Sequence, residues 1–169
     1  MFSFGSVRHS AWRSVFALLI VSCLSAVLLF TGCKTDEDDD PGPLHGTWKS
    51  EYNEVYIIDL NNNKFNVPNT DYPDYAWAGT IKEIGTLNST SGIIFIEITS
   101  KGSSFGTSGS GNITGVYYSD LAGNEMKIST ASDAAYKTPV RPTLAEAKAL
   151  LNVDSLAEYF AGSSAVIRQ

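Results

Sequence analysis

The sequence predicts a mainly β fold, either a sandwich or a small antiparallel barrel, followed by one or two short helices. From Gly46 onward, short runs rich in β-branched and aromatic residues alternate with clusters of turn-forming residues, which is typical of such folds. Ile94, Ile96 and Ile98 occupy alternate positions, so they fall on one face of a strand. After Asp133 the apolar spacing changes to that of a helix.

Each expected strand ends at residues that favour turns. The expected strands span residues 46–52, 55–60, 64–67, 75–87, 93–99, 112–119 and 125–130. The segments between them are rich in Asn, Ser and Gly, which favour turns. The run 75–87 is long for one strand, and we expect Gly79 and Gly85 inside it to mark bends or bulges that let a sheet curl and close.

Two short helices and a closing strand are expected near the C-terminus. Thr143 and Glu146 have the spacing of a capping box, which predicts a helix through Leu151. Asn152 has the position of a cap for a second short helix. Residues 165–167 are expected to form the closing strand.

The N-terminal segment has the layout of a secretory signal. Arg8 and Arg13 provide a positively charged start, and residues 14–32 form an apolar run without a charged side chain. An uncleaved signal anchor is the alternative, because about 20 apolar residues can cross a bilayer and both arginines lie on the flank that stays inside. The residues at the end of the run favour cleavage.

Small residues, Thr31 and Gly32, directly precede Cys33. This arrangement resembles the lipobox of bacterial lipoproteins, although Phe30 stands where that pattern prefers Leu. The resemblance implies cleavage just before Cys33, lipidation of its thiol, and acylation of the new N-terminus with palmitate or a similar chain, so that the protein is held in membrane lipid. Cleavage at the other cysteine, Cys23, would leave a largely apolar stretch on the mature protein, which suits a tethered domain poorly.

The chain therefore divides into a signal peptide (1–32), a lipidated acidic linker (33–45) and a β domain (46–169). Cleavage before Cys33 leaves 137 of the 169 residues, which suits one domain. Loss of two arginines leaves 10 basic against 18 acidic side chains, a net charge of −8, which argues against nucleic-acid binding. With Cys23 removed and Cys33 lipidated, no disulfide is expected.

The linker contains five adjacent acidic residues, 36–40, whose mutual repulsion favours an extended spacer. Three aspartates of this run have the spacing of the first ligands in a calcium-binding EF-hand loop. However, Pro41 stands where that loop needs Gly, and Thr47 stands where it needs a bidentate Glu. We therefore expect no metal site here.

Several segments resemble a single protein family. They are Gly46-Thr47-Trp48-Lys49-Ser50, residues 115–121, residues 131–136 and the helix that begins after Thr143. Together they resemble a family of small spirochaetal lipoproteins with a lipocalin-like barrel, over most of residues 46–161. The resemblance implies a small antiparallel lipocalin-like barrel with one or two short C-terminal helices. It also implies that Gly46 permits close approach and that the Trp48 indole plugs the closed end.

The residue types do not form a recognisable catalytic or cofactor site. His45 is the one histidine of the mature chain, and its place at the edge of the linker predicts a solvated side chain. Asp71 and Asp74 lie in a proline-flanked stretch, where turn formation is expected. Single acids in expected strands are expected to face solvent, and these are Asp59, Glu83 and Glu97. We expect a protein that is not an enzyme and needs no cofactor.

Aromatic residues are concentrated in the expected strands, and they have two possible roles. They either fill the core of a solid barrel or line a concave apolar pocket at its mouth. Tyr75, Trp77 and Phe95 alternate with polar neighbours, so they are the candidate ligand-binding residues of a barrel lumen.

Two functions remain open. The first is that of a membrane-anchored, non-catalytic bacterial lipoprotein that binds a small apolar ligand in a barrel lumen. The second is that of a surface interaction protein, an adhesin or inhibitor, that uses the barrel as a scaffold against a host or envelope macromolecule. Lys34 follows Cys33 where an Asp would act as a retention signal in enteric bacteria. By that analogy we expect the outer membrane of the cell envelope, on its periplasmic or surface face.

Overall fold

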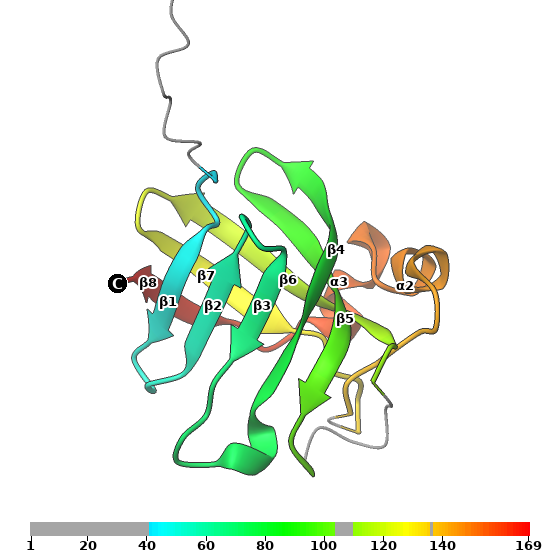
Figure 1. Cartoon of the computed structure of the whole chain (residues 1–169). Coiled ribbons are helices and arrows are strands. Elements are labelled where there is room, and N and C mark those ends of the chain that lie inside the picture. Colours follow the sequence, from blue (N-terminus) through cyan, green and yellow to red (C-terminus); the bar gives the residue numbers. More distant parts are fainter. Residues whose placement is uncertain (1–40, 104–109, 136) are drawn as a thin grey trace, which may run out of the picture. The chain divides into compact units, whose positions relative to one another are not determined.

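The computed structural model describes residues 41–103, 110–135 and 137–169 (Figure 1). In these ranges eight strands form one closed barrel. The strands are β1 (Gly46–Ser50), β2 (Val55–Asp59), β3 (Lys64–Val67), β4 (Trp77–Asn88), β5 (Ser91–Lys101), β6 (Ile113–Ala122), β7 (Glu125–Thr130) and β8 (Ser164–Arg168). The predicted lipidation site at Cys33 and the acidic run 36–40 lie outside the described residues.

The barrel closes because its last strand pairs with its first. Each strand is antiparallel to the next, and β8 pairs with both β7 and β1. Val166 lies opposite Ser50 on one side and Met126 on the other. Closure pairs the edges that an open sheet would leave exposed. The predicted barrel is confirmed, and so is the closing strand expected at residues 165–167.

Several strands begin or end where the sequence did not predict, and three of them illustrate why. β1 ends at Ser50, before a turn in which Asn53 has a φ of +64°. β4 begins at Trp77 because the preceding residues form a 3-10 helix, η1 (Pro73–Tyr75). Proline fixes φ near the helical value, so Pro73 favours this turn over an extended strand. β5 begins at Ser91, two residues earlier than expected.

The pairing of β4 with β5 contains three register shifts, which bend the sheet. One lies at Ala78 and Gly79, where a Cβ on the glycine would lie 2.4 Å from Cγ2 of Ile96. The bulge expected at Gly79 is therefore confirmed. The expectation for Gly85 was wrong in position, since that residue pairs in register with Ile93 and the other two shifts lie on either side of it.

The inner face of the barrel carries the main apolar core. Ile94, Ile96 and Ile98 all belong to it and are fully buried, as their alternation predicts. The other large members are Trp48, Tyr56, Ile58, Phe65, Trp77, Ile81, Val116, Tyr118, Met126, Ile128 and Val166. Burial of each large apolar side chain contributes roughly 1.5–3 kcal/mol, so this core is the main source of stability.

One end of the barrel is covered by the residues that precede β1, and we call it the closed end. Trp48 is fully buried there, and its Nε1–H donates to the carbonyl of Leu44 at 3.0 Å. The guanidinium of Arg168 lies 4.8 Å from the centre of the indole ring. Gly46 has a φ of +139°, and a Cβ there would lie 3.4 Å from Arg168. Because Leu44 is itself buried, residues assigned to the linker contribute to the folded barrel.

The C-terminal helices form a layer on the outside of β5 and β6 (Figure 1). They are α2 (Leu144–Leu150), η3 (Val153–Ser155) and α3 (Leu156–Tyr159). Their apolar residues bury a second cluster that contains Ile93, Phe95, Ile113, Ala131, Ala147, Leu151 and Phe160. A Cβ on Gly115 would lie 2.9 Å from Cδ1 of Leu151, so this glycine allows the close packing of the layer on β6.

Both predicted caps are present. The hydroxyl of Thr143 accepts from the backbone N–H of Glu146 at 3.3 Å and donates to its carboxylate at 2.8 Å. The side chain of Asn152 accepts from the N–H of Asp154 at 2.9 Å. These bonds satisfy N–H groups that a helix start leaves unpaired, so local side-chain chemistry helps to define where α2 and η3 begin.

Candidate binding site at the barrel mouth

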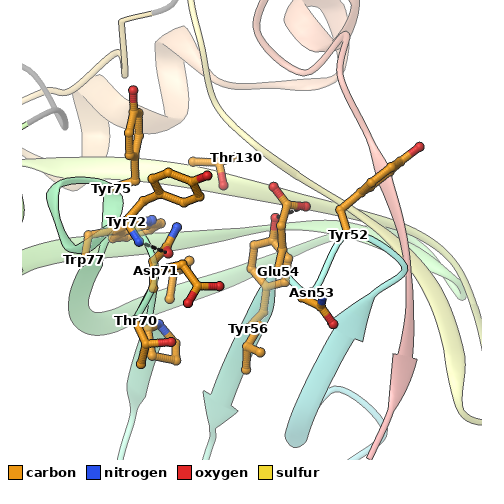
Figure 2. A pocket seen from close by; sticks show the side chains of 14 residues that line it. Tyr52, Asn53, Glu54, Tyr56, Thr70, Asp71, Tyr72, Tyr75, Trp77 and Thr130 are labelled. Carbon is orange, nitrogen blue, oxygen red and sulfur yellow. Dashed lines mark hydrogen bonds between the residues drawn. The ribbon is translucent and has the colours of Figure 1, made fainter.

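The end of the barrel opposite the closed end contains a pocket with a volume of about 540 Å³ (Figure 2). We call this end the mouth. The pocket lies between the β1–β2 turn and the β3–β4 connection, and Thr130 at the end of β7 also lines it. Small-molecule sites typically have volumes of about 300–1,000 Å³. The pocket is therefore large enough for a ligand of about the size of an amino acid or larger.

The base of the pocket is aromatic and belongs to the barrel core. Trp77 and Tyr56 line the pocket and are only 5% and 7% exposed. Beneath them, Phe65 packs against Trp77 with a distance of 5.0 Å between ring centres. The interior beyond is occupied by fully buried side chains such as Ile58. A ligand in this pocket would therefore contact the end of the core that faces the mouth.

The rim of the mouth carries three strongly exposed tyrosines. Tyr52, Tyr72 and Tyr75 are 75%, 66% and 60% exposed. In Figure 2, Tyr72 and Tyr75 stand on the side of Trp77, whereas the ring of Tyr52 turns away from the other labelled side chains. Exposed aromatic rings at the opening of a pocket provide contact area that a ligand can bury.

Local hydrogen bonds fix the β3–β4 connection that carries two of these tyrosines. The N–H of Tyr72 donates to Oδ1 of Asn69 at 2.8 Å, and the N–H of Tyr75 donates to the carbonyl of Tyr72 at 3.0 Å. The hydroxyl of Ser103 donates to Asp74 at 2.6 Å, which ties η1 to the end of β5. Asp74 thus stabilises a turn, as the sequence predicts.

On the other side of the pocket, the β1–β2 turn holds Glu54. The buried hydroxyl of Ser50 accepts from the N–H groups of Tyr52 and Glu54 at 3.2 and 3.1 Å. The Glu54 carboxylate accepts from Ser164 of β8 at 2.9 Å and from the phenol of Tyr56 at 3.4 Å. These bonds orient the carboxylate beside β8, the strand that closes the barrel.

The charges that line the pocket are of one sign. Glu54 and Asp71 line it, whereas no Lys, Arg or His is among its described lining residues. Burial raises the pKa of the Tyr56 phenol well above its ordinary value, and the nearby Glu54 carboxylate raises that pKa further. Tyr56 is therefore a protonated hydrogen-bond donor at neutral pH.

The structure brings two of the three predicted binding residues together and separates the third. Tyr75 and Trp77 both line the mouth pocket, although Tyr75 lies in η1 instead of a strand. Phe95 lies on the outer face of β5, buried beneath the helical layer. It cannot face the lumen because its neighbours Ile94 and Ile96 already do, and successive strand residues point to opposite faces.

Most residues of the pocket were not identified from the sequence as binding residues. Among them, Glu54 and Tyr72 lie in connections, where no periodic pattern indicates which way a side chain points. Tyr56 had a usable signal, because it alternates with the buried Ile58 and so shares the inner face of β2.

The other titratable residues considered from the sequence lie away from this pocket. Glu83 and Glu97 accept from Lys148 and Lys82 at 2.5 and 2.9 Å. Asn62 hydrogen-bonds the Asp59 carboxylate and lowers its pKa. Among the described residues, no three His, Cys, Asp or Glu side chains are grouped as metal ligands would be.

The expectation of a solvated His45 was wrong. Its Nδ1 accepts from the N–H of Leu60 at 3.1 Å, and its ring is only partly exposed. The residue lies against the β2–β3 turn at the closed end because the polypeptide is already part of the barrel before β1 begins. His45 is therefore a structural acceptor in the folded domain.

Within the described part of the chain, no helix is both long enough and apolar enough to span a membrane. No protein-family model matches the chain, and no curated protein matches it. The chain is similar to the crystal structure of Treponema pallidum Tp0751 (Pallilysin), with 8% sequence identity and a TM-score of 0.46, over 75% of this chain and 80% of that one.

Proposed function

We propose that the protein is a lipoprotein of the bacterial cell envelope, anchored through lipid on Cys33, whose barrel binds a small molecule at its mouth and catalyses no reaction. The observation that carries the binding role is the pocket of about 540 Å³ with the aromatic side chains of Trp77 and Tyr56 at its base. The apolar part of the ligand would contact these rings. This differs from a ligand deep in the lumen, where large side chains are packed.

The anchoring role is supported by the positive start, the uncharged apolar run and the small residues before Cys33. Two or more acyl chains suffice for stable attachment, whereas one chain is marginal. In a bacterial host fed labelled palmitate, Cys33→Ala should abolish incorporation and block maturation. Cys23→Ala is the matched control and should be labelled normally. Loss of label only with Cys23→Ala would contradict the assignment.

The absence of catalysis is supported by where the strand carboxylates lie. Glu83 and Glu97 are paired with lysines, and neither is among the residues that line the mouth pocket. A glycosidase-like pair would need two carboxylates about 5–10 Å apart in a cleft. Glu54 and Asp71 are the acids that share a pocket, so hydrolysis of chromogenic glycosides that is lost in Glu54→Gln and Asp71→Asn would overturn this part of the proposal.

Binding at the mouth can be tested with an apolar fluorescent probe. Residues 41–169, after circular dichroism has verified their β structure, should enhance the fluorescence of N-phenyl-1-naphthylamine. Trp77→Ala should weaken this binding because it removes the base of the pocket. Phe95→Leu is the control, since Phe95 is an equally buried aromatic residue on the outer face of the barrel, away from the pocket. Equal effects of the two variants would contradict a site at the mouth.

A surface interaction role is the second candidate, and the three exposed rim tyrosines favour it. Tyr52, Tyr72 and Tyr75 all lie at one end of the barrel, and aromatic residues are enriched where proteins bind each other. Replacement of all three by Ser should abolish binding to a macromolecular partner on the envelope or host. If the triple variant still bound such a partner, the rim would not be the interface.

A further inference from the structure

The mouth pocket combines two chemical features that are complementary to one class of ligand. Its described lining contains two carboxylates, Glu54 and Asp71, and no cationic side chain. It also contains Tyr56, Tyr72 and Trp77, whose ring faces carry negative electrostatic potential. Both features attract a positive charge, and both disfavour a negative one.

The two carboxylates enter the pocket from different connections. Glu54 lies in the β1–β2 turn, directly before β2, whereas Asp71 lies in the β3–β4 connection. Figure 2 shows the Asp71 carboxylate directed toward the side of the opening that carries Glu54 and Tyr56. A cationic group in this opening would therefore have carboxylate oxygens available from two sides.

The Glu54 carboxylate is held in place before any ligand binds. Ser164 donates to Oε2 at 2.9 Å, and the Tyr56 phenol donates to the same oxygen at 3.4 Å. An ionised carboxylate has about four acceptor positions, so acceptor capacity remains for a ligand. A neutral apolar ligand would remove water from these carboxylates without replacing it, which is unfavourable.

We infer that the mouth pocket takes an amphipathic organic cation, an ammonium group attached to an aromatic or alkyl body. The inference rests on the proposed binding function and specifies its ligand class. The cationic head would lie near Glu54 and Asp71, and the apolar body would rest on Trp77 and Tyr56. The acidic character of the whole chain would also favour the approach of cations.

Three probes of similar shape test the ligand class. Phenyltrimethylammonium is a cation, tert-butylbenzene is its neutral isostere, and benzenesulfonate is an anion. Each is titrated into the full mature lipoprotein in nonionic detergent, with Trp fluorescence as the readout and protein-free micelles as the blank. The cation should bind at least about tenfold more tightly than the neutral isostere, and the anion should bind least.

Charge-removing variants identify the residues. Glu54→Gln and Asp71→Asn should each weaken binding of phenyltrimethylammonium by about threefold or more and should not weaken binding of tert-butylbenzene. Glu125→Gln is the matched control, because Glu125 is an exposed acid at the start of β7, near the closed end. It should change neither affinity. Unchanged circular dichroism and thermal unfolding would verify the fold of each variant.

The outcomes separate the inference from the function on which it rests. If tert-butylbenzene bound as tightly as the cation, the inference would be overturned while a binding pocket remained. If Glu125→Gln weakened cation binding as much as Glu54→Gln, the effect would come from net charge and the assigned residues would be wrong. If N-phenyl-1-naphthylamine and all three probes failed to bind, the proposed pocket function itself would fail.

Discussion

The two ends of the barrel each contain a buried tryptophan, but only one of these tryptophans borders a pocket. At the closed end, Trp48 donates to Leu44 and is covered by Arg168. At the mouth, Trp77 packs on Phe65 and lines an open pocket. The difference lies in what covers each ring. The same residue type therefore serves as a structural plug at one end and as a candidate ligand surface at the other.

The largest expected effect breaks the plug. Trp48→Ala should lower the free energy of unfolding by about 3–5 kcal/mol, because the surrounding core can only partly fill the space left by the indole. Denaturant unfolding of residues 41–169, followed by circular dichroism, measures this. Val153→Ala, at a residue that is 59% exposed, is the control and should change stability by less than about 0.5 kcal/mol. A loss below about 1 kcal/mol for Trp48→Ala would contradict the plug.

A smaller effect should come from the cover on that plug. Arg168→Met keeps most of the side-chain length but removes the cation above Trp48 and the donor to the Pro43 carbonyl. We expect a loss of about 1–2 kcal/mol, because both a cation–π contact and a charged hydrogen bond disappear. Thermal unfolding measures it, with Lys127→Met as the control at an exposed ion pair. If the two variants were equally stable, the contacts of Arg168 at the closed end would not contribute to stability.

The structural features that could be predicted are those whose cause lies in the neighbouring sequence. The alternation of Ile94, Ile96 and Ile98 predicted the inner face of β5 because a strand's period is set by its own backbone. The burial of Phe95 on the other face depends on a helical layer that begins about 50 residues later. No pattern within β5 reports that layer.

The closed end and the mouth were hard to predict for related reasons. Leu44 and His45 follow an acidic run and resemble linker, but their roles come from contacts with Trp48 and Leu60. At the mouth, the Glu54 carboxylate accepts a hydrogen bond from Ser164 of β8, which is more than 100 residues away. Tertiary contacts of this kind override what local composition suggests.

The mouth should contribute to the pH dependence of the free energy of unfolding through Tyr56. The folded pKa of Tyr56 is raised above its unfolded value, so its contribution to stability is fully present below about pH 10 and is lost as pH rises above that value. The expected loss is at most about 1.4 kcal/mol per pH unit. Tyr56→Phe should flatten the decrease in the free energy of unfolding between pH 10 and 11. A decrease as steep as that of the unmodified protein would assign the effect to other groups, and Tyr118 is the first alternative because burial raises its pKa too.

The smallest effect on stability is expected at the rim of the mouth, and it is what distinguishes a binding residue from a structural one. Tyr72 is 66% exposed, and both of its described hydrogen bonds within the connection use its backbone N–H and carbonyl, which Tyr72→Ala retains. The variant should therefore unfold within about 0.5 kcal/mol of the unmodified protein. Its affinity for a ligand of the mouth pocket should nevertheless fall, because the lost ring lines that pocket. Unfolding and probe titration of the same preparation measure both quantities. A variant that lost stability without losing affinity would reverse the assignment and make the rim part of the scaffold, as the closed end is.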